Sequence, residues 1–262
     1  MQYGQNAFVT LTYASDEQVT LDPAHARDFL KRIRRSIEPV KIRFYLVGEY
    51  GDKSERPHYH VALFNYPCCT HGLTQYNRNG IKCCDTCKTI QLLWGYGNIY
   101  VGSLEPHSAA YIAGYVTKKM TRYDDIRLNN RHPEFARMSL KPGIGHDAMW
   151  DYASVLLQYA ENHVDVPNSL RHGGKPLPLG RYLTRTARRM MGRKEETPLE
   201  TIQKSQEKLL SLQETALASA SGYGSTEIRK MVYKNLILDK FEGNRRNVEA
   251  RYKLYGKKKG SL

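Results

Sequence analysis

Two neighbouring segments with alternating side chains constrain the fold more than any other feature of this chain. Residues 41–50 (KIRFYLVGEY) and 57–64 (PHYHVALF) are rich in β-branched and aromatic residues, which are typical of strands. The segment between them is short and contains turn-forming residues. We therefore predict an antiparallel hairpin over residues 41–64.

The second strand of this hairpin carries two histidines on one face. Side chains alternate along a strand, so His58 and His60 project to the same side. The hairpin pairing then brings Glu49 of the first strand beside them. Two imidazoles and one carboxylate, with room for water or a substrate oxygen, suit a divalent metal ion that acts on phosphate. The alternative is a pair of ordinary histidines with the usual hydrogen bonds.

A second motif lies at residues 108–120 (SAAYIAGYVTKKM). Tyr111 and Tyr115 are four residues apart and share one face of a helix, and Lys118 lies close to the same side. Two phenols and an ammonium group then point in one direction. The alternative is an amphipathic helix with half-buried tyrosines and with lysines at its C-terminal end.

Together these motifs resemble the HUH endonucleases, in the two-tyrosine class that starts rolling-circle replication. The resemblance is closest to the replication initiators of microviruses, in particular the gokushovirus branch. The blocks that carry it, in the expected order, are residues 8–13 (FVTLTY), 48–64 with its HYH, 111–119 (YIAGYVTKK) and 141–145 (KPGIG). The resemblance covers residues 5–150.

This resemblance implies a metal-dependent, site-specific endonuclease and ligase that nicks single-stranded DNA at a phage origin. One of Tyr111 and Tyr115 is expected to attack the phosphodiester, which leaves a 5′-phosphotyrosine link and a free 3′-hydroxyl for synthesis. The other is expected to cut the regenerated origin. Lys118 is expected to steady a phosphate or the phenolate, and Lys119 to contact DNA.

The family pattern also makes His58 and His60 metal ligands, with Glu49 as the third. Histidine ligands favour Mn²⁺, while cellular abundance favours Mg²⁺. Host helicase and DNA polymerase are the expected protein partners, in the cytoplasm of a bacterial host. Two alternatives stay open: another HUH enzyme, such as a plasmid relaxase or transposase, or an RRM-like module that binds nucleic acid without cutting it. Such modules usually place aromatic residues on the open sheet face, whereas this strand presents histidines.

The charge of the chain agrees with a nucleic-acid partner. The formal net charge is +14 and the pI is about 9.5, which favours a polyanionic partner, although simple solubility would give the same charge. No apolar run is long enough to cross a bilayer, and the first residues lack the pattern of a signal peptide. We expect no membrane association. No P-loop motif occurs in the sequence.

Residues 66–88 contain all five cysteines together with a histidine. Clustered cysteines in a chain without an export signal favour metal binding over disulfides. The residues with knuckle-like spacing for a structural zinc site are Cys68, His71, Cys84 and Cys87. Cys69 or Cys83 can replace one of these ligands. A loop of reduced thiols is the alternative.

The order of expected elements predicts the fold class. A strand at residues 7–13, a helix that begins after Asp22, the hairpin, the cysteine-rich insert, a helix at residues 89–96, a strand at 98–104 and the tyrosine helix follow one another. This order predicts an α+β fold, a ferredoxin-like or RRM-like antiparallel sheet with packed helices, which HUH domains also have. We place this domain at residues 1–165.

The remainder of the chain is predicted to be a connector and a helical extension. Residues 166–180 are rich in proline and glycine, which indicates a connector. Residues 181–262 form a basic, mostly helical extension, with one helix at 198–220 and another at 225–241. Its expected DNA-binding residues are Arg181, Arg185, Arg188 and Arg189, with a solvated helix face as the alternative.

Overall fold

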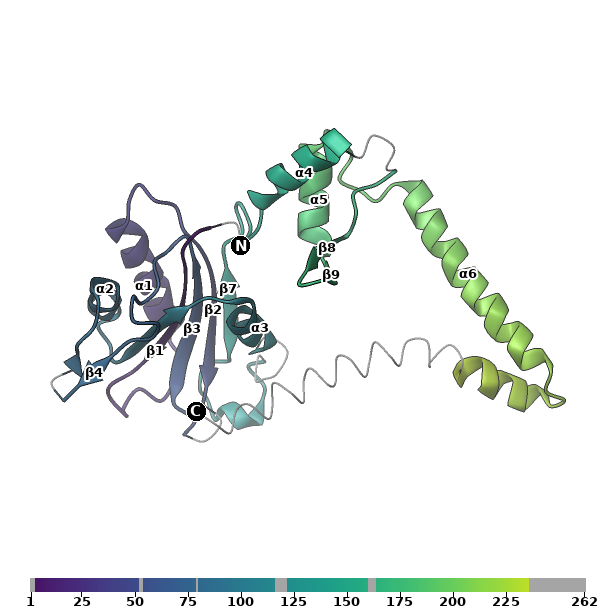
Figure 1. The fold of residues 1–262 in the computed structure, drawn as a ribbon. Coiled ribbons are helices and arrows are strands. Elements are labelled where there is room, and N and C mark those ends of the chain that lie inside the picture. The colour runs from purple at the N-terminus through teal and green to yellow at the C-terminus, as the bar shows by residue number, and fades with distance from the viewer. Residues whose placement is uncertain (1–2, 52–53, 79, 116–121, 160–163, 236–262) are drawn as a thin grey trace. The chain divides into compact units, whose positions relative to one another are not determined.

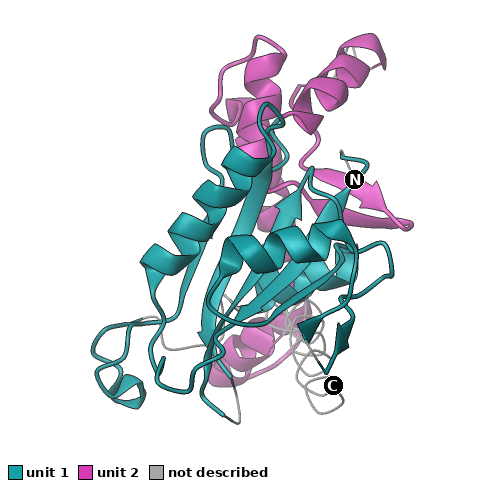
Figure 2. Cartoon of the chain, turned by 90° about the vertical axis from the view of Figure 1, so that its left-hand side faces the viewer, with its two compact units in different colours: residues 1–146 teal, residues 147–262 magenta. Residues whose placement is uncertain are grey.

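The computed structural model describes residues 3–51, 54–78, 80–115, 122–159 and 164–235 (Figure 1). The chain divides into two compact units, residues 1–146 and residues 147–262 (Figure 2). None of the helices within the described ranges is long and apolar enough to cross a membrane.

Unit 1 is built on a five-stranded antiparallel sheet in the order β6-β1-β3-β2-β7. Its strands are β1 (Asn6–Thr12), β2 (Arg43–Tyr50), β3 (Pro57–Phe64), β6 (Ile99–Ser103) and β7 (Phe135–Met138). The hairpin predicted from the alternating segments is the β2–β3 pair, in which Glu49 lies opposite His58. The strand order β6-β1-β3-β2 with its connecting helices is the ferredoxin-like arrangement. The predicted α+β fold class is confirmed.

Helices cover both faces of this sheet. On one face, α1 (Pro23–Ser36) and α2 (Asp85–Trp94) pack over the strands, and on the other face lies α3 (Pro106–Tyr115) (Figure 1). The first face holds the larger core, with Phe29 and Trp94 fully buried among strand residues. The α3 face has a smaller core around Val47, Ala62 and Ile112.

The ends of the helices follow from local sequence. Asp22 caps α1, because its Oδ1 accepts a hydrogen bond of 2.7 Å from the backbone N–H of Ala24. Helix α2 ends at Gly95, whose φ of 72° is left-handed. That helix begins at Asp85, four residues before the predicted start at Thr89, because the acidic side chain of Asp85 suits a first turn.

Gly97 lies where the segment after α2 crosses the end of β1. A Cβ at this position would lie 2.3 Å from both the carbonyl oxygen of Thr12 and the backbone nitrogen of Ala14. The crossing is held by hydrogen bonds from Thr12 N to Asn98 O (2.9 Å) and from Ala14 N to Tyr96 O (3.0 Å). This close approach of two backbones requires glycine.

The cysteine-rich insert lies along the outer edge of β6. It contains a short hairpin of β4 (Tyr76–Asn77) and β5 (Gly80–Ile81). Thr74 N donates to Val101 O at 3.2 Å, and Ile99 N donates to the Tyr76 hydroxyl at 2.9 Å. The insert therefore satisfies backbone groups of an edge strand that would otherwise be open to another chain.

The segment after α3 completes unit 1. A 3₁₀ turn (Ile126–Leu128) precedes β7, which pairs with β2 and was not expected from the sequence. Three of the four residues of β7 are exposed, so the strand lacks the apolar signal of the central strands. The expected tight turn at residues 141–145 is present, and a bridge between Leu140 and Gly143 closes it.

Unit 2 contains α4 (Ala148–Tyr159), β8 (Ser169–His172), β9 (Lys175–Pro178), α5 (Gly180–Met190) and α6 (Leu199–Ser221). Met149 of α4, Val166 and Ala187 of α5 form its buried core. The division at residues 146 and 147 precedes the expected domain edge at 165, because α4 packs against α5.

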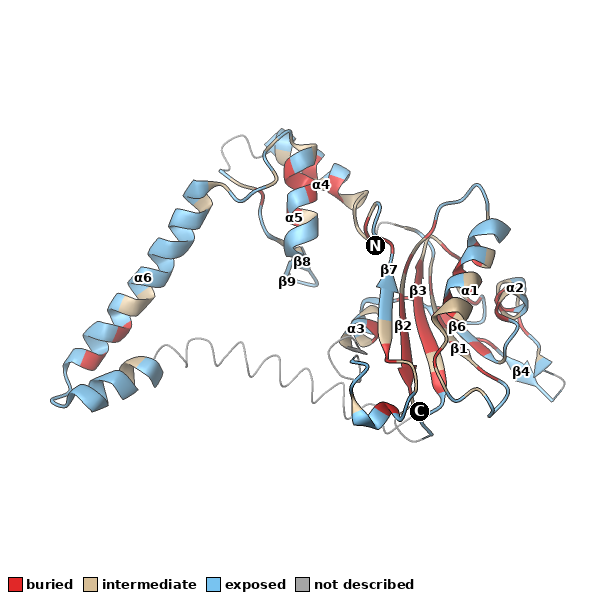
Figure 3. Ribbon diagram, turned by 180° about the vertical axis from the view of Figure 1, so that it is seen from behind, coloured by how far each residue is buried: buried red, intermediate tan, exposed pale blue. Residues whose placement is uncertain are grey.

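The expected connector at 166–180 contains the β8–β9 hairpin. Its two central turn residues, Gly173 and Gly174, have φ angles of 55° and 77°, which is the conformation of a tight hairpin turn. Helix α6 agrees with the prediction for 198–220, and it is exposed along most of its length, with Ala216 and Ala220 buried (Figure 3). Residues 226–235 are helical, and the rest of the helix predicted at 225–241 lies outside the described residues.

Candidate functional site

Glu49, His58 and His60 converge on the α3 side of the sheet. His58 Nε2 lies 2.9 Å and His60 Nε2 lies 3.3 Å from the same oxygen, Glu49 Oε1. Glu49 and His60 are buried and His58 is half-buried. Their ligand atoms all lie within 4.8 Å of one another, so these three residues are able to hold a metal ion.

The outer nitrogens of both imidazoles have hydrogen-bond partners. His58 Nδ1 lies 3.1 Å from the carbonyl oxygen of Arg56, which can only accept, so Nδ1 carries the hydrogen. His60 Nδ1 lies 3.0 Å from Thr10 Oγ1. Sequence reasoning did not identify these two partners, although Thr10 lies directly opposite His60 on the neighbouring strand. Metal-binding histidines in proteins are usually held in this way through the second ring nitrogen.

This arrangement fits a bound cation. A neutral His58 with its hydrogen on Nδ1 presents the lone pair of Nε2 towards the oxygen of Glu49. Two lone pairs in contact repel, so a proton on a charged imidazole or a metal cation has to lie between them. The three donors therefore match the ligand set of a divalent ion.

The carboxyl group of Glu49 is ionised at neutral pH. Burial raises its pKa, but hydrogen bonds with His58 and His60 outweigh burial and hold the pKa well below its usual range. A carboxylate is the form that binds metal ions.

Helix α3 brings Tyr111 to this metal-ligand group. The centroids of the Tyr111 and His60 rings are 5.7 Å apart, with the rings nearly perpendicular, and Phe8 packs against both rings. Ile112 of the same helix is fully buried against the sheet and fixes the helix there. One of the two predicted tyrosines therefore lies beside a predicted metal ligand.

The other residues expected near this site are described less fully. Tyr115 is the last residue of α3, one turn after Tyr111, and its side chain is outside the described part of the chain. Lys118 and Lys119 also lie outside the described residues.

The cysteine-rich insert forms a second candidate metal group, with a ligand set that differs from the predicted one. It consists of Cys69, Cys83, Cys84 and Cys87, whose sulfurs lie within 4.8 Å of one another. Of the four predicted ligands, Cys84 and Cys87 belong to this group, and Cys68 and His71 do not. The reason is that Cys69 is buried in the core, while Cys68 is half-buried and His71 is exposed.

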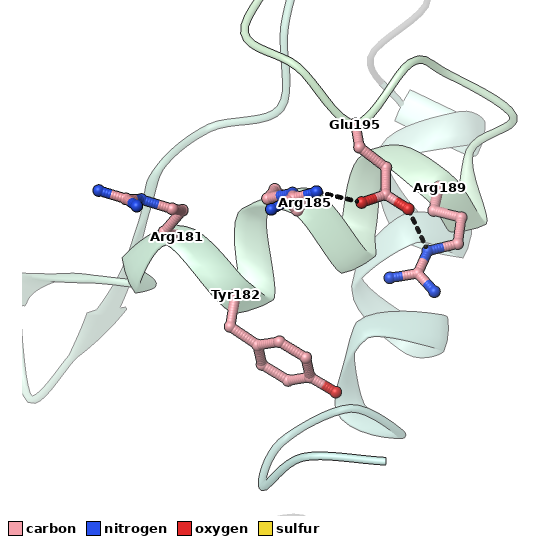
Figure 4. Close-up of a pocket in the computed structure, with 5 residues that line it drawn as sticks. All are labelled: Arg181, Tyr182, Arg185, Arg189 and Glu195. Atoms are coloured by element: carbon pink, nitrogen blue, oxygen red, sulfur yellow. Dashed lines mark hydrogen bonds and ion pairs between the residues drawn. The ribbon is translucent and has the colours of Figure 1, made fainter. Parts of the chain in front are cut away.

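Three of the arginines expected to bind DNA lie on the exposed face of α5. Arg181, Arg185 and Arg189 follow one another at four-residue spacing and line a surface pocket with Tyr182 and Glu195 (Figure 4). Glu195 forms ion pairs of 2.8 Å with Arg185 and 3.0 Å with Arg189. The pocket is therefore basic with one carboxylate at its side.

Arg188 differs from the prediction that it binds DNA. Its side chain is buried, and its Nε and Nη2 donate to the two oxygens of Asp165 at 2.8 Å and 2.7 Å. Its Nη1 donates to the carbonyl oxygen of Glu195 at 3.0 Å. The guanidinium is fully used inside unit 2, so Arg188 stabilises this unit and does not face a ligand.

Comparison with known proteins identifies relatives of this chain. Residues 6–120 match the family model of the replication-associated protein ORF2. The chain is similar to replication-associated protein ORF2 of Spiroplasma virus 4, with 38% identity over 151 residues, 53% of this chain and 46% of that protein. It is also similar to replication-associated protein VP4 of Bdellovibrio phage phiMH2K, with 31% identity over 69% of this chain and 57% of the relative.

A third relative is replication-associated protein ORF4 of Chlamydia phage 1, with 28% identity over 79% of this chain and 52% of that protein. The chain thus spans about half the length of the curated relatives it matches. No solved structure matches the chain significantly.

The buried pair of Asp165 and Arg188 gives a prediction about unit 2. Asp165→Asn leaves a buried guanidinium without its carboxylate, so we expect unit 2 to lose about 3 kcal/mol of unfolding free energy at pH 7. The measurement is urea unfolding of the full chain followed by hydrogen exchange of unit 2. Asp151→Asn, an exposed position on α4, is the matched control and should change stability little.

The same pair gives a pH dependence. Burial raises the pKa of Asp165, but the hydrogen bonds from Arg188 and from the backbone of Val166 outweigh it, so the pKa lies below its usual value. A lowered pKa in the folded state means that the stabilisation is complete above the unfolded pKa of about 3.9 and is lost as the pH falls through the folded value. The difference between wild type and Asp165→Asn should therefore shrink below about pH 4. Equal stability of the two proteins at pH 7 would contradict this role for the pair.

Proposed function

The chain belongs, over residues 6–120, to the family of the replication-associated protein ORF2, and on this premise we propose that it initiates rolling-circle replication. In this proposal it is a metal-dependent, site-specific endonuclease and ligase for single-stranded DNA, and its chemistry uses tyrosine. The observation that supports this most directly is the position of the Tyr111 ring beside His60, a member of the metal-ligand group.

Glu49, His58 and His60 would hold the divalent ion. When bound, Mn²⁺ or Mg²⁺ would polarise the scissile phosphate and stabilise negative charge on its oxygens. Imidazole ligands favour Mn²⁺ over Mg²⁺, which prefers oxygen donors. The hydrogen bonds of the two Nδ1 atoms keep both Nε2 atoms directed at the same point, beside the ionised Glu49.

Tyr111 is the proposed nucleophile of the first cleavage. Its hydroxyl oxygen forms a bond to phosphorus while the bond from phosphorus to the 3′ oxygen breaks. The phenol gives up its proton and the departing 3′ oxygen takes one up, so the products are a 5′-phosphotyrosine and a free 3′-hydroxyl. The phosphotyrosine conserves the phosphodiester, and attack by a 3′-hydroxyl rejoins the strand without a nucleotide cofactor.

Tyr115 and Lys118 complete the proposed mechanism. Tyr115 lies one helical turn after Tyr111, which is the spacing needed for a second phenol to cut the regenerated origin while the first link persists. Lys118 is proposed to steady the phosphate or the phenolate. Single-stranded DNA at the origin is the substrate, and host helicase and polymerase in the bacterial cytoplasm are the proposed partners.

A surface on α5 is proposed to hold the DNA backbone outside the cleavage site. Arg181, Arg185 and Arg189 are exposed on one face of this helix, and Arg188 is excluded because Asp165 engages it. Lys119 is proposed as a further phosphate contact. Such contacts add affinity without sequence preference.

Two other functions fit the site less well. A binding module that does not cut DNA has no need of a buried carboxylate with two histidines and an adjacent phenol, so the site favours an enzyme. A relaxase or transposase would use the same chemistry. The names of the three relatives, each a replication-associated protein, favour an initiator instead.

The nicking mechanism predicts a covalent protein–DNA adduct. We would incubate the full chain and Mn²⁺ or Mg²⁺ with single-stranded oligonucleotides tiled across the source replicon, and separate the products on a denaturing gel. Tyr111→Phe should reduce the first cleavage at least 100-fold, and the double change with Tyr115→Phe should abolish the adduct, because phenylalanine has no attacking oxygen. Removal of both imidazoles, His58→Ala with His60→Ala, should also abolish it.

Tyr123→Phe is the matched control, because Tyr123 is exposed in unit 1 and away from the metal ligands. It should cut as the wild type does. If every oligonucleotide is bound but none is cut or linked with either metal, the enzymatic function is wrong and a binding module is the better interpretation.

The hydrogen bond between Thr10 and His60 predicts an effect on metal affinity. Thr10→Val keeps the shape of the side chain but removes the partner of His60 Nδ1, so we expect Mn²⁺ to bind roughly 10-fold more weakly. Isothermal titration calorimetry measures this without any cleavage. Thr12→Val is the matched control, since Thr12 Oγ1 on the same strand donates to Asn98 O instead. Unchanged affinity in Thr10→Val would show that Thr10 does not support a metal ligand.

The α5 surface predicts a change in the salt dependence of DNA binding. Replacement of Arg181, Arg185 and Arg189 by alanine removes three proposed phosphate contacts, so the slope of log K against log salt should fall by about 2 for single-stranded DNA. Fluorescence anisotropy over a salt series measures the slope. Replacement of the exposed lysines Lys204, Lys208 and Lys230 is the control with equal charge loss, and an equal fall there would argue against a specific surface on α5.

A further inference from the structure

The four sulfurs of the insert are spaced as ligands of one metal ion. Cys69 Sγ lies 3.4 Å from Cys83 Sγ and 3.9 Å from Cys84 Sγ, and Cys84 Sγ lies 3.7 Å from Cys87 Sγ. Sulfurs at about 2.3 Å from a tetrahedral zinc ion are about 3.8 Å apart. All four cysteines are free thiols, so their spacing is compatible with a common central ion.

Polar groups around the sulfurs argue against plain apolar packing. Cysteines often pack as small hydrophobic side chains, and such packing needs no hydrogen-bond donors. Here Thr74 Oγ1 lies 3.2 Å from Cys87 Sγ, and the imidazole Nδ1 of His71 lies 3.6 Å from Cys83 Sγ. Donors at these positions stabilise thiolates, as the outer partners of metal-bound sulfurs do.

Backbone groups add to this environment. Cys69 has a backbone hydrogen bond from His71, and Cys84 has one from Thr70. These donors belong to the turn that directly follows Cys69. The turn is therefore folded around the sulfurs and not only over the core.

We propose that Cys69, Cys83, Cys84 and Cys87 bind one structural zinc ion that fixes the insert to the outer edge of β6. Four thiolates favour zinc over Mn²⁺ or Mg²⁺, which prefer oxygen ligands, and they leave no position open for a substrate. Each thiol that binds zinc releases its proton to solvent, so binding is linked to pH and to folding.

The position of this site explains what the metal does. Cys69 and Cys83 are 14 residues apart in the chain, and a zinc ion would close the loop between them and join it to α2 through Cys87. The closed loop contains Thr74 and Tyr76. Thr74 N donates to Val101 O at 3.2 Å, Val101 N donates to Thr74 Oγ1 at 2.7 Å, and Ile99 N donates to the Tyr76 hydroxyl.

The zinc site therefore protects an edge strand of the sheet. Strand β6 pairs on its other side with β1, and β1 carries Thr10, the partner of His60. Loss of zinc should free the loop and expose the outer backbone groups of β6. Metal content and edge protection are both measured without DNA, so the zinc site stands or falls separately from the nicking function.

The test begins with the metal content of the full chain, purified under reducing conditions without chelator and analysed by plasma mass spectrometry. We expect one zinc ion per chain. The variant that lacks both His58 and His60 should keep it, which separates this site from the other metal group. Cys68→Ser and His71→Ala should also keep zinc, whereas Cys69→Ser and Cys84→Ser should lose it.

Two further measurements cover the case in which cysteine variants fail to fold. Cobalt substitution of the wild-type protein should give the strong charge-transfer absorption of a four-thiolate tetrahedral site. Removal of zinc by a chelator should speed amide exchange at Ile99 and Val101 while the amides of β3 stay protected. A wild-type protein with no zinc, with iron in its place, or with zinc that Cys68→Ser or His71→Ala releases, would overturn the proposal.

Discussion

The candidate site depends on the pairing register of β2 and β3. Glu49 lies opposite His58, and His60 follows two residues along the same face. A slip of one residue would turn Glu49 to the opposite face of the sheet and separate it from both imidazoles. The register is secure because both strands are buried on the α1–α2 face as well as on the α3 face, with Leu46 and Val61 fully buried.

The opposite face also fixes the site through Tyr59, which lies between the two histidines in sequence. Its hydroxyl is 2.8 Å from that of Tyr13 and donates to the carbonyl oxygen of Asp22 at 3.0 Å. Burial raises the pKa of Tyr59 to about 12, so the phenol stays neutral and keeps these hydrogen bonds. A strand held this firmly by one residue has little freedom to move the residues on either side of it, which point to the metal group.

Much of this arrangement follows from local sequence, and the rest depends on tertiary contacts. Alternation over residues 41–64 was enough to predict the hairpin and to place Glu49 beside the two histidines, and Asp22 and Gly95 marked helix ends correctly. Spacing could not decide between Cys68 and Cys69, because the choice depends on which neighbour faces the core. It also could not show that Arg188 is buried, since Asp165 is distant in sequence.

The chemical site and the basic surface belong to separately packed parts of the chain. The metal-ligand group and Tyr111 lie among the two cores of unit 1, while α5 packs on the core of Met149, Val166 and Ala187 in unit 2. Every described contact that orients Glu49, His58, His60 and Tyr111 comes from residues 6–115, within the segment that matches the family model. The geometry for cleavage is therefore a property of unit 1, and the arginines of α5 add DNA affinity through a body with its own buried ion pair.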